Sequence, residues 1–158
     1  MILIDLNVIV DVTLRRSPHF ASSLVVVNRV VQGRLPAAMA AHNITTLDYV
    51  MTRYANAEAA KRLVDWALAV FEIVPVGPHE LRRAQALNWP DFEDAVVAAA
   101  AETAGCTTIV TRNVRDFRGS VVPAVLPEEL VINEVHESFV RRYGDKDGAR
   151  RAGTDSAG

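Results

Sequence analysis

The stretch Ile2-Leu3-Ile4-Asp5, three apolar residues followed by a carboxylate, decides how the rest of the chain is interpreted. Such a run is typical of a strand buried in a parallel sheet, and ligands of open α/β sheets bind beyond the carboxyl ends of the strands. Asp91, Glu93 and Asp94 precede a long apolar helix pattern, and Asp116 follows another strand-like run. We therefore expect these carboxylates to gather at one edge of a sheet, where they repel one another unless a cation lies between them.

The composition indicates one folded domain. The chain has 158 residues, half of them hydrophobic, which suits a single domain with a core and excludes disorder of the whole chain. A net charge of −2 does not by itself indicate a nucleic-acid-binding protein. Of the 17 basic residues only Lys61 and Lys146 are lysines. Local groups of arginines could bind phosphates and stack on bases, but a genome that prefers arginine codons is the first explanation for most of them.

Membrane insertion and disulfide bonding are not expected. Cys106 is the single cysteine, and its apolar surroundings predict a buried small side chain rather than a nucleophile. Charged residues interrupt every apolar run before it reaches membrane-spanning length, and no basic region precedes a signal-like core. We therefore expect a cytoplasmic protein.

Strand-like and helix-like segments alternate along the chain, which predicts a central, mainly parallel sheet in a three-layer α/β/α sandwich. The expected strands are residues 2–5, 36–40, 72–76, 107–111 and 124–126, and the expected helices are residues 7–14, 18–32, 43–54, 57–70, 78–87 and 91–104, with a last helix from Pro127. We expect Pro18 at the first position of its helix and Asn43 or Thr45 as a helix cap. Residues 1–131 form the expected domain, and residues 132–158 a helical extension with a disordered tail.

The acids have both chemical and structural explanations. Asp5 ends a hydrophobic strand and must reach solvent or be paired, but an aspartate there also suits a helix cap or a turn. Asn7 adds a neutral polar group that can orient a ligand or water. Asp91 is expected to cap the helix that follows it, and Asp94, three residues later, faces the same side. Asp11 is expected to be solvated or paired with an arginine.

The segment from Thr111 to Asp116 offers several oxygen ligands in one short turn, because Asn113 lies between them. Arg112, Arg115 and Arg118 would neutralise the acids or bind a phosphate backbone, or would equally be surface residues.

Three stretches of the chain resemble PIN-domain ribonucleases of the VapC toxin type: residues 2–12, 91–95 and 109–117. Residues 127–130 also resemble the closing element of that family. The resemblance implies that Asp5, Asp94 and Asp116 collect one or two Mg²⁺ or Mn²⁺ ions and that Asn7 and Asn113 lie beside these acids. It further implies that the protein hydrolyses single-stranded RNA and leaves a 5′-phosphate. A cognate antitoxin and a second copy of the chain are the partners that the resemblance implies.

One position departs from the family pattern. Most of these nucleases have a glutamate early in the third helix, and by alignment this position is Thr46. Asp48 lies two residues further on, about 200° around the helix, and so cannot replace it. Asp91 or Glu93 is then expected to supply the fourth carboxylate.

The predicted function is therefore a metal-dependent endoribonuclease, and two alternatives remain. Thr46 favours a weak or inactive PIN fold that only binds RNA or a partner. A phosphotransfer domain needs an acid pair near the first strand and a lysine late in the sheet, whereas this chain has Asn7 and no such lysine.

The helix expected over residues 18–32 predicts an interface. It contains the continuous run Leu24-Val25-Val26-Val27, and consecutive residues point around the whole circumference of a helix. We expect a second copy or an antitoxin to cover part of this surface, and a neighbouring helix of the same chain is the alternative.

Overall fold

A computed structural model describes residues 1–143, and the expected disordered tail, residues 144–158, lies outside the described residues. One sheet of five strands has the order β3-β2-β1-β4-β5, and all neighbouring pairs are parallel. The strands are β1 (Ile2–Ile4), β2 (Ala37–Ala40), β3 (Glu72–Val74), β4 (Thr108–Val110) and β5 (Ala124–Val125). Ile2 of the central strand pairs with Ala37 on one side and with Thr108 on the other.

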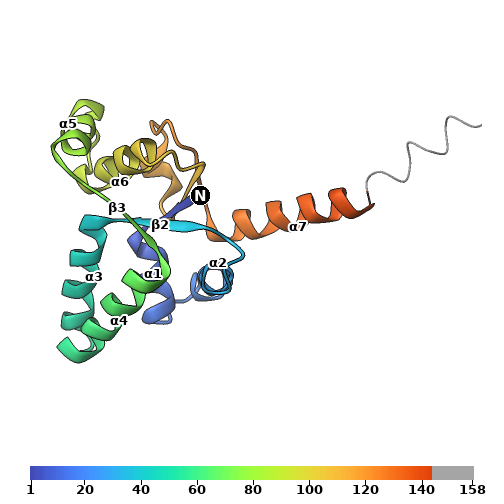
Figure 1. The fold of residues 1–158 in the computed structure, drawn as a ribbon, viewed down its shortest axis with the longest axis horizontal. Helices are drawn as coiled ribbons and strands as arrows, with labels where there is room; N and C mark the ends of the chain where they lie inside the picture. Colours follow the sequence, from blue (N-terminus) through green and yellow to red (C-terminus); the bar gives the residue numbers. More distant parts are fainter. Residues whose placement is uncertain (144–158) are drawn as a thin grey trace, which may run out of the picture.

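Helices cover both faces of the sheet, which confirms the α/β/α sandwich (Figure 1). Below the strands in that view lie α1 (Leu6–Thr13), α2 (Phe20–Val31), α3 (Ala41–Tyr54) and α4 (Ala57–Val70). Above them lie α5 (Pro78–Leu87) and α6 (Phe92–Thr103).

The two faces of the sheet carry separate apolar cores, because side chains alternate along a strand. Ile2, Ile4 and Met39 belong to the core under α1 to α4, whereas Leu3 and Ala38 belong to the core under α6. Helix α6 is buried continuously from Ala95 to Ala101, as its apolar pattern predicted.

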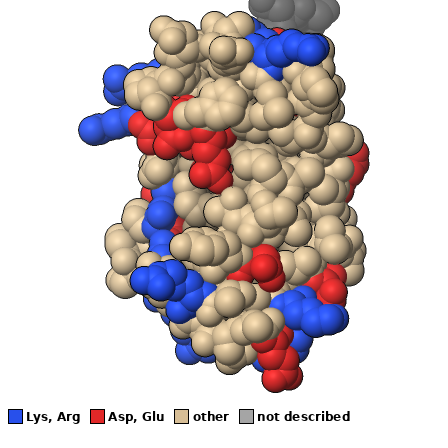
Figure 2. All heavy atoms as spheres, turned by 90° about the vertical axis from the view of Figure 1, so that its left-hand side faces the viewer, with Lys and Arg blue, Asp and Glu red and all other residues tan. Residues whose placement is uncertain are grey.

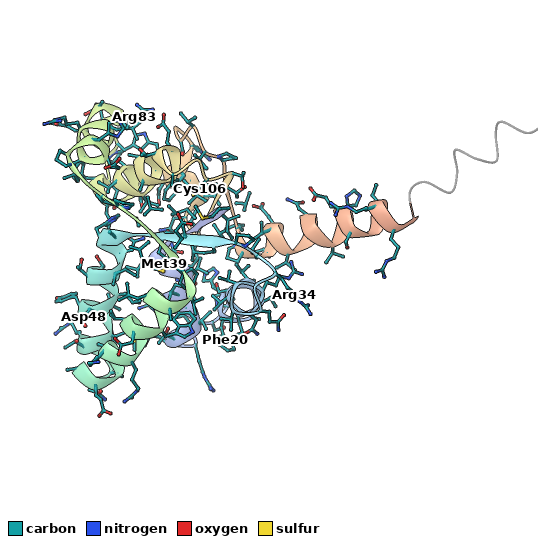
Figure 3. The ribbon with its side chains drawn as sticks, viewed as in Figure 1. Phe20, Arg34, Met39, Asp48, Arg83 and Cys106 are labelled. Carbon is teal, nitrogen blue, oxygen red and sulfur yellow. The ribbon has the colours of Figure 1, made fainter. Side chains whose placement is uncertain are left out.

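Cys106 lies between α6 and β4, is 7% exposed and forms no disulfide, so it is a buried small side chain, as expected (Figure 3).

Two details of the helix starts differ from the sequence predictions. Helix α2 begins at Phe20 rather than Pro18, because residues 15–19 reverse the chain after α1, and Arg15 has a left-handed φ of 50° there. Helix α3 follows β2 directly, so Ala40 is its N-cap. Asn43 is therefore buried inside the helix, and neither it nor Thr45 is the cap.

The last helix, α7 (Pro127–Tyr143), starts where the sequence predicted and extends away from the body of the protein (Figure 1). Leu130 and Val131 pack against the core, whereas Ile132, Val135 and Val140 are 64%, 56% and 48% exposed. None of the helices in residues 1–143 is both long and apolar enough to cross a membrane.

Candidate active site

A cavity of about 380 Å³ opens at the carboxyl edge of the sheet. Its wall combines residues from the β1–α1 junction, α3, the start of α6 and the turn after β4: Asp5, Leu6, Asn7, Val10, Arg16, Val50, Tyr54, Asp91, Glu93, Asp94, Arg112, Asn113 and Asp116. All six residues that the sequence placed at a catalytic site are among them. Figure 2, which looks at the edge where β2 passes into α3, shows acidic side chains gathered in one patch with basic side chains beside it.

Asp5 is held by a small hydrogen-bond network at the ends of β1 and β4. Its Oδ2 accepts hydrogen bonds from Asn7 Nδ2 at 2.6 Å and from Thr111 Oγ1 at 2.7 Å. The Thr111 hydroxyl in turn accepts from Asn7 Nδ2 and from the backbone N–H of Asn113, both at 3.0 Å. Asn7 Oδ1 accepts from the backbone N–H of Arg112 at 3.2 Å. Asp5 occupies the N-cap position of α1, but its side chain makes no capping bond.

This position raises the pKa of Asp5. The side chain is 7% exposed, and burial raises its pKa to about 6, against the opposing effect of the Thr111 hydrogen bond. The charge of Glu93 raises it further. Asp5 is thus a fixed carboxylate whose ionisation is costly in a metal-free protein.

Asp94 is the electrostatic centre of the acidic group. Its pKa is raised to about 7, first by burial and then by the negative charges of Asp5, Asp91, Asp116 and Glu93. Four carboxylates contributed by three separate parts of the chain therefore act on this one side chain.

Asp91 has the structural role that the sequence predicted. It is the N-cap of α6, and its Oδ1 accepts hydrogen bonds from the backbone N–H groups of Glu93 at 2.8 Å and Asp94 at 3.3 Å. The cap fixes the first turn of α6, which carries the other two acids.

Glu93 lies opposite the position where the sequence lacks an acid. Thr46 Oγ1 donates to Glu93 Oε1 at 3.4 Å, a long hydrogen bond that joins α3 to α6. Asp48 is exposed and does not line the cavity; Figure 3 shows it on α3, well below the strands.

Asp116 and Asn113 belong to the turn after β4. A short 3-10 helix, η1 (Val114–Phe117), carries Asp116, whose backbone N–H donates to Asn113 O at 2.9 Å. Phe117 anchors the turn: it is 3% exposed and packs edge-on against Trp89, with ring centroids 6.0 Å apart. The apolar residue at the end of this segment therefore holds the acid at the cavity.

A family model of the PIN domain matches residues 1–115, most of the chain. The chain belongs to the PIN domain family. This family consists of nucleases, and they generally use divalent metal ions. A search of curated proteins found no significant match to this PIN domain.

Solved structures share the fold at low sequence identity. A toxin–antitoxin complex from Klebsiella pneumoniae is similar with a TM-score of 0.61 and 21% identity, and FitAcB from Neisseria gonorrhoeae with 0.64 and 20%. VapBC2 from Rickettsia felis, bound to a DNA fragment from its promoter, gives 0.61 and 16%. Each match covers 80% of this chain and 98% of the other chain. The PIN fold is therefore shared almost over the full length of these neighbours.

Two arginines also line the cavity of the PIN domain: Arg112, one of the arginines expected beside the acids of the turn after β4, and Arg16, which the sequence did not assign to the site. Arg112 Nη1 donates a hydrogen bond to Asp11 Oδ1 at 2.8 Å. Asp11 is therefore paired with an arginine, which is one of the two states expected for it. Arg16 lies with its Cζ 6.0 Å from the ring centroid of Tyr54. Tyr54 follows Val50 by four residues on α3, so the sequence spacing indicates that both lie on the same face of the helix. No sequence pattern around Arg16 indicates that it lines the cavity.

The donor set fits a hard divalent cation, because every acidic group offers oxygen and, after burial, the charges of four neighbouring carboxylates raise the pKa of Asp94. Within residues 1–143, however, no three carboxylate, imidazole or thiol groups lie close enough together to form a complete metal site. Joint ligation of one ion by Asp5, Asp94 and Asp116 therefore stays a prediction.

Proposed function

We propose that this PIN domain is a metal-dependent endoribonuclease that hydrolyses phosphodiester bonds of single-stranded RNA, and that it is the toxin of a toxin–antitoxin pair. The observation that carries the proposal is the meeting of Asp5, Asp94 and Asp116 at one cavity, although they come from three distant parts of the chain. Membership of a nuclease family supports it.

Asp5, Asp94 and Asp116 would hold Mg²⁺ or Mn²⁺. When bound, the ion lowers the pKa of a water molecule and neutralises charge on the phosphate. Hydrolysis that breaks the bond between phosphorus and O3′ leaves a 5′-phosphate and a 3′-hydroxyl. Because the pKa of Asp94 is raised to about 7, proton release from this carboxyl would accompany metal binding near neutral pH.

The neighbouring residues position these groups. Asn7 and Thr111 hold the Asp5 carboxylate through Oδ2. Asn113 offers its amide at the rim of the cavity. Arg112, fixed by its bond to Asp11, presents a cation there that can bind a phosphate oxygen.

Cleavage of labelled single-stranded RNA, in Mg²⁺, in Mn²⁺ and in a chelator, tests the proposal. We expect metal-dependent cleavage by the wild type and a loss of at least about a hundredfold in Asp94→Asn and Asp116→Asn, since catalytic metal ligands act together. Asp48→Asn is the matched control, because Asp48 is an exposed acid outside the cavity. Equal cleavage by all four proteins would contradict this site.

The alternative is a PIN fold that binds RNA or a partner without cutting. Thr46 favours it, because a neutral side chain stands where most relatives have an acid. Binding of RNA by the wild type with no cleavage in either metal would favour this alternative.

An antitoxin and a second copy of the chain are the proposed protein partners. An apolar cleft of about 310 Å³ lies between α1, α2 and α4, with Val12, Leu24, Val27, Val31 and Trp66 in its wall. Val31 is 53% exposed, so this wall offers apolar surface to another chain. The neighbour from Klebsiella pneumoniae, described as a toxin–antitoxin complex, supports an antitoxin as one occupant. Light scattering of the chain alone and with a co-expressed neighbouring gene product tests both assemblies.

A further inference from the structure

The acidic cavity has a second end of different chemistry. Besides the acids, its wall contains Arg16 and Tyr54, together with the apolar residues Val10 and Val50. Tyr54 is 64% exposed, so its ring is open to a ligand. The cavity therefore joins a group of carboxylates to an exposed aromatic ring with a guanidinium beside it.

We propose that Tyr54 and Arg16 form a nucleotide subsite, in which Tyr54 stacks on a base and Arg16 binds the adjacent phosphate of the single-stranded RNA. This inference rests on the proposed function and adds to it the residues that hold the substrate next to the cleavage point.

Helix α3 supplies the geometry. Thr46, Val50 and Tyr54 are spaced by four residues and so lie along one face of the helix. Thr46 contacts Glu93 at the acidic end, and Tyr54 lies eight residues further, about 12 Å along the axis at 1.5 Å per residue. An extended strand of RNA that follows this wall from the acids thus reaches the Tyr54 ring.

The charges are arranged for a phosphate. Arg112 uses Nη1 for its bond to Asp11, and within residues 1–143 no carboxylate forms an ion pair with Arg16, so Arg16 is a second cation for a phosphate at this cavity. The guanidinium of Arg16 is held beside the Tyr54 ring by a cation–π contact, which positions it without using its hydrogen-bond donors. A planar cation with free donors suits a phosphate group, and an exposed aromatic ring suits the face of any base.

Fluorescence anisotropy with single-stranded RNA tests the subsite, and every protein carries Asp116→Asn so that the RNA is not cleaved. Tyr54→Ala should weaken binding roughly five- to a hundredfold, the range for loss of one base–aromatic stack. Tyr54→Phe should retain the affinity, because the ring remains. Tyr49→Ala is the matched control, an exposed tyrosine of the same helix outside the cavity, and should have no effect.

A series of RNAs with one base removed at a time locates the contact. Removal of the base that stacks on Tyr54 should weaken RNA binding by the protein that retains Tyr54. The same RNA should bind to Tyr54→Ala as well as the intact RNA does. Arg16→Ala should weaken binding and reduce the salt dependence by about one phosphate contact, whereas Arg53→Ala, on the exposed end of α3, should not.

Several results would overturn the subsite: unchanged affinity in Tyr54→Ala, equal sensitivity of both proteins to every abasic position, or weakened binding of an antitoxin but not of RNA. Circular dichroism melting of each variant identifies any loss caused by misfolding, and Tyr54→Phe then decides whether the ring matters. If the wild type fails to cleave RNA while the binding pattern holds, the nuclease proposal fails and the subsite stands.

Discussion

Asp11 and Arg112 form a 2.8 Å ion pair between residues 101 positions apart in the chain, and Asp11 is completely buried. Burial raises the pKa of Asp11, and the charge of Arg112 opposes that effect. Because the backbone N–H of Arg112 also donates to Asn7, the pair joins α1 to the turn after β4 directly beneath the cavity.

Removing only the cation should be strongly destabilising. Arg112→Ala leaves a buried carboxylate without its partner, and we expect the free energy of unfolding to fall by about 3–5 kcal/mol. Urea denaturation measures this. The double variant Asp11→Asn with Arg112→Ala should recover part of the loss, since it removes the unpaired charge. A double variant as unstable as Arg112→Ala would mean that lost packing, rather than charge, is responsible.

The metal-free protein should become less stable as the pH rises toward neutrality. Asp94 and Asp5 have pKa values of about 7 and about 6 in the folded protein, above the value of 3.8 for an unperturbed aspartate. The folded state therefore holds protons that the unfolded state has lost. The free energy of unfolding should fall from about pH 4 to about pH 7 and then level off, by a few kcal/mol at about 1.4 kcal/mol per pKa unit. Asp94→Asn should flatten this curve in chemical denaturation at each pH.

Divalent metal should reverse that cost. Mg²⁺ or Mn²⁺ that binds only the folded state raises the melting temperature by mass action, with about 2.7 kcal/mol at a hundred times the dissociation constant. Asp94→Asn should be more stable than the wild type without metal, because it relieves repulsion, and should lose most of the metal response. Calorimetry with and without metal compares them, and identical metal shifts in the two proteins would place the ion elsewhere.

Asp91 and Glu93 can be separated as candidates for the fourth carboxylate. Oδ1 of Asp91 already caps α6, whereas Glu93 lines the cavity and contacts Thr46 of α3. Asparagine caps a helix about as well as aspartate. We therefore expect Asp91→Asn to keep both stability and most cleavage, and Glu93→Gln to lose cleavage at least about tenfold. The opposite order in an RNA cleavage assay would assign the role to Asp91.

The sequence was sufficient for the elements but not for every contact. Alternation of apolar runs predicted the sheet and its helices, because burial sets those patterns directly. Two helix starts were predicted wrongly from Pro18 and Asn43. Tertiary packing sets the sharp turn at Arg15 before α2 and the direct passage from β2 into α3.

The candidate site shows the same division. Its acids could be predicted because parallel strands end at a common edge. The place of Arg16 depends on how the chain reverses between α1 and α2, which no local pattern records. The separation of the carboxylates depends on side-chain rotamers, which no sequence pattern specifies.

The apolar face of α2 provides the last prediction. Val26 and Val27 are buried and Val25 is 41% exposed, as expected for a continuous run that one side of a helix cannot bury. Val31 is 53% exposed in the cleft with α1 and α4, so Val31→Arg should leave folding intact and disrupt association with a second copy or an antitoxin. Val27→Arg should instead unfold the protein, because Val27 is 4% exposed. Light scattering and thermal melting of the two variants separate the effects. A wild type that is monomeric at micromolar concentration, together with antitoxin binding that Val31→Arg leaves unchanged, would exclude this face as an interface.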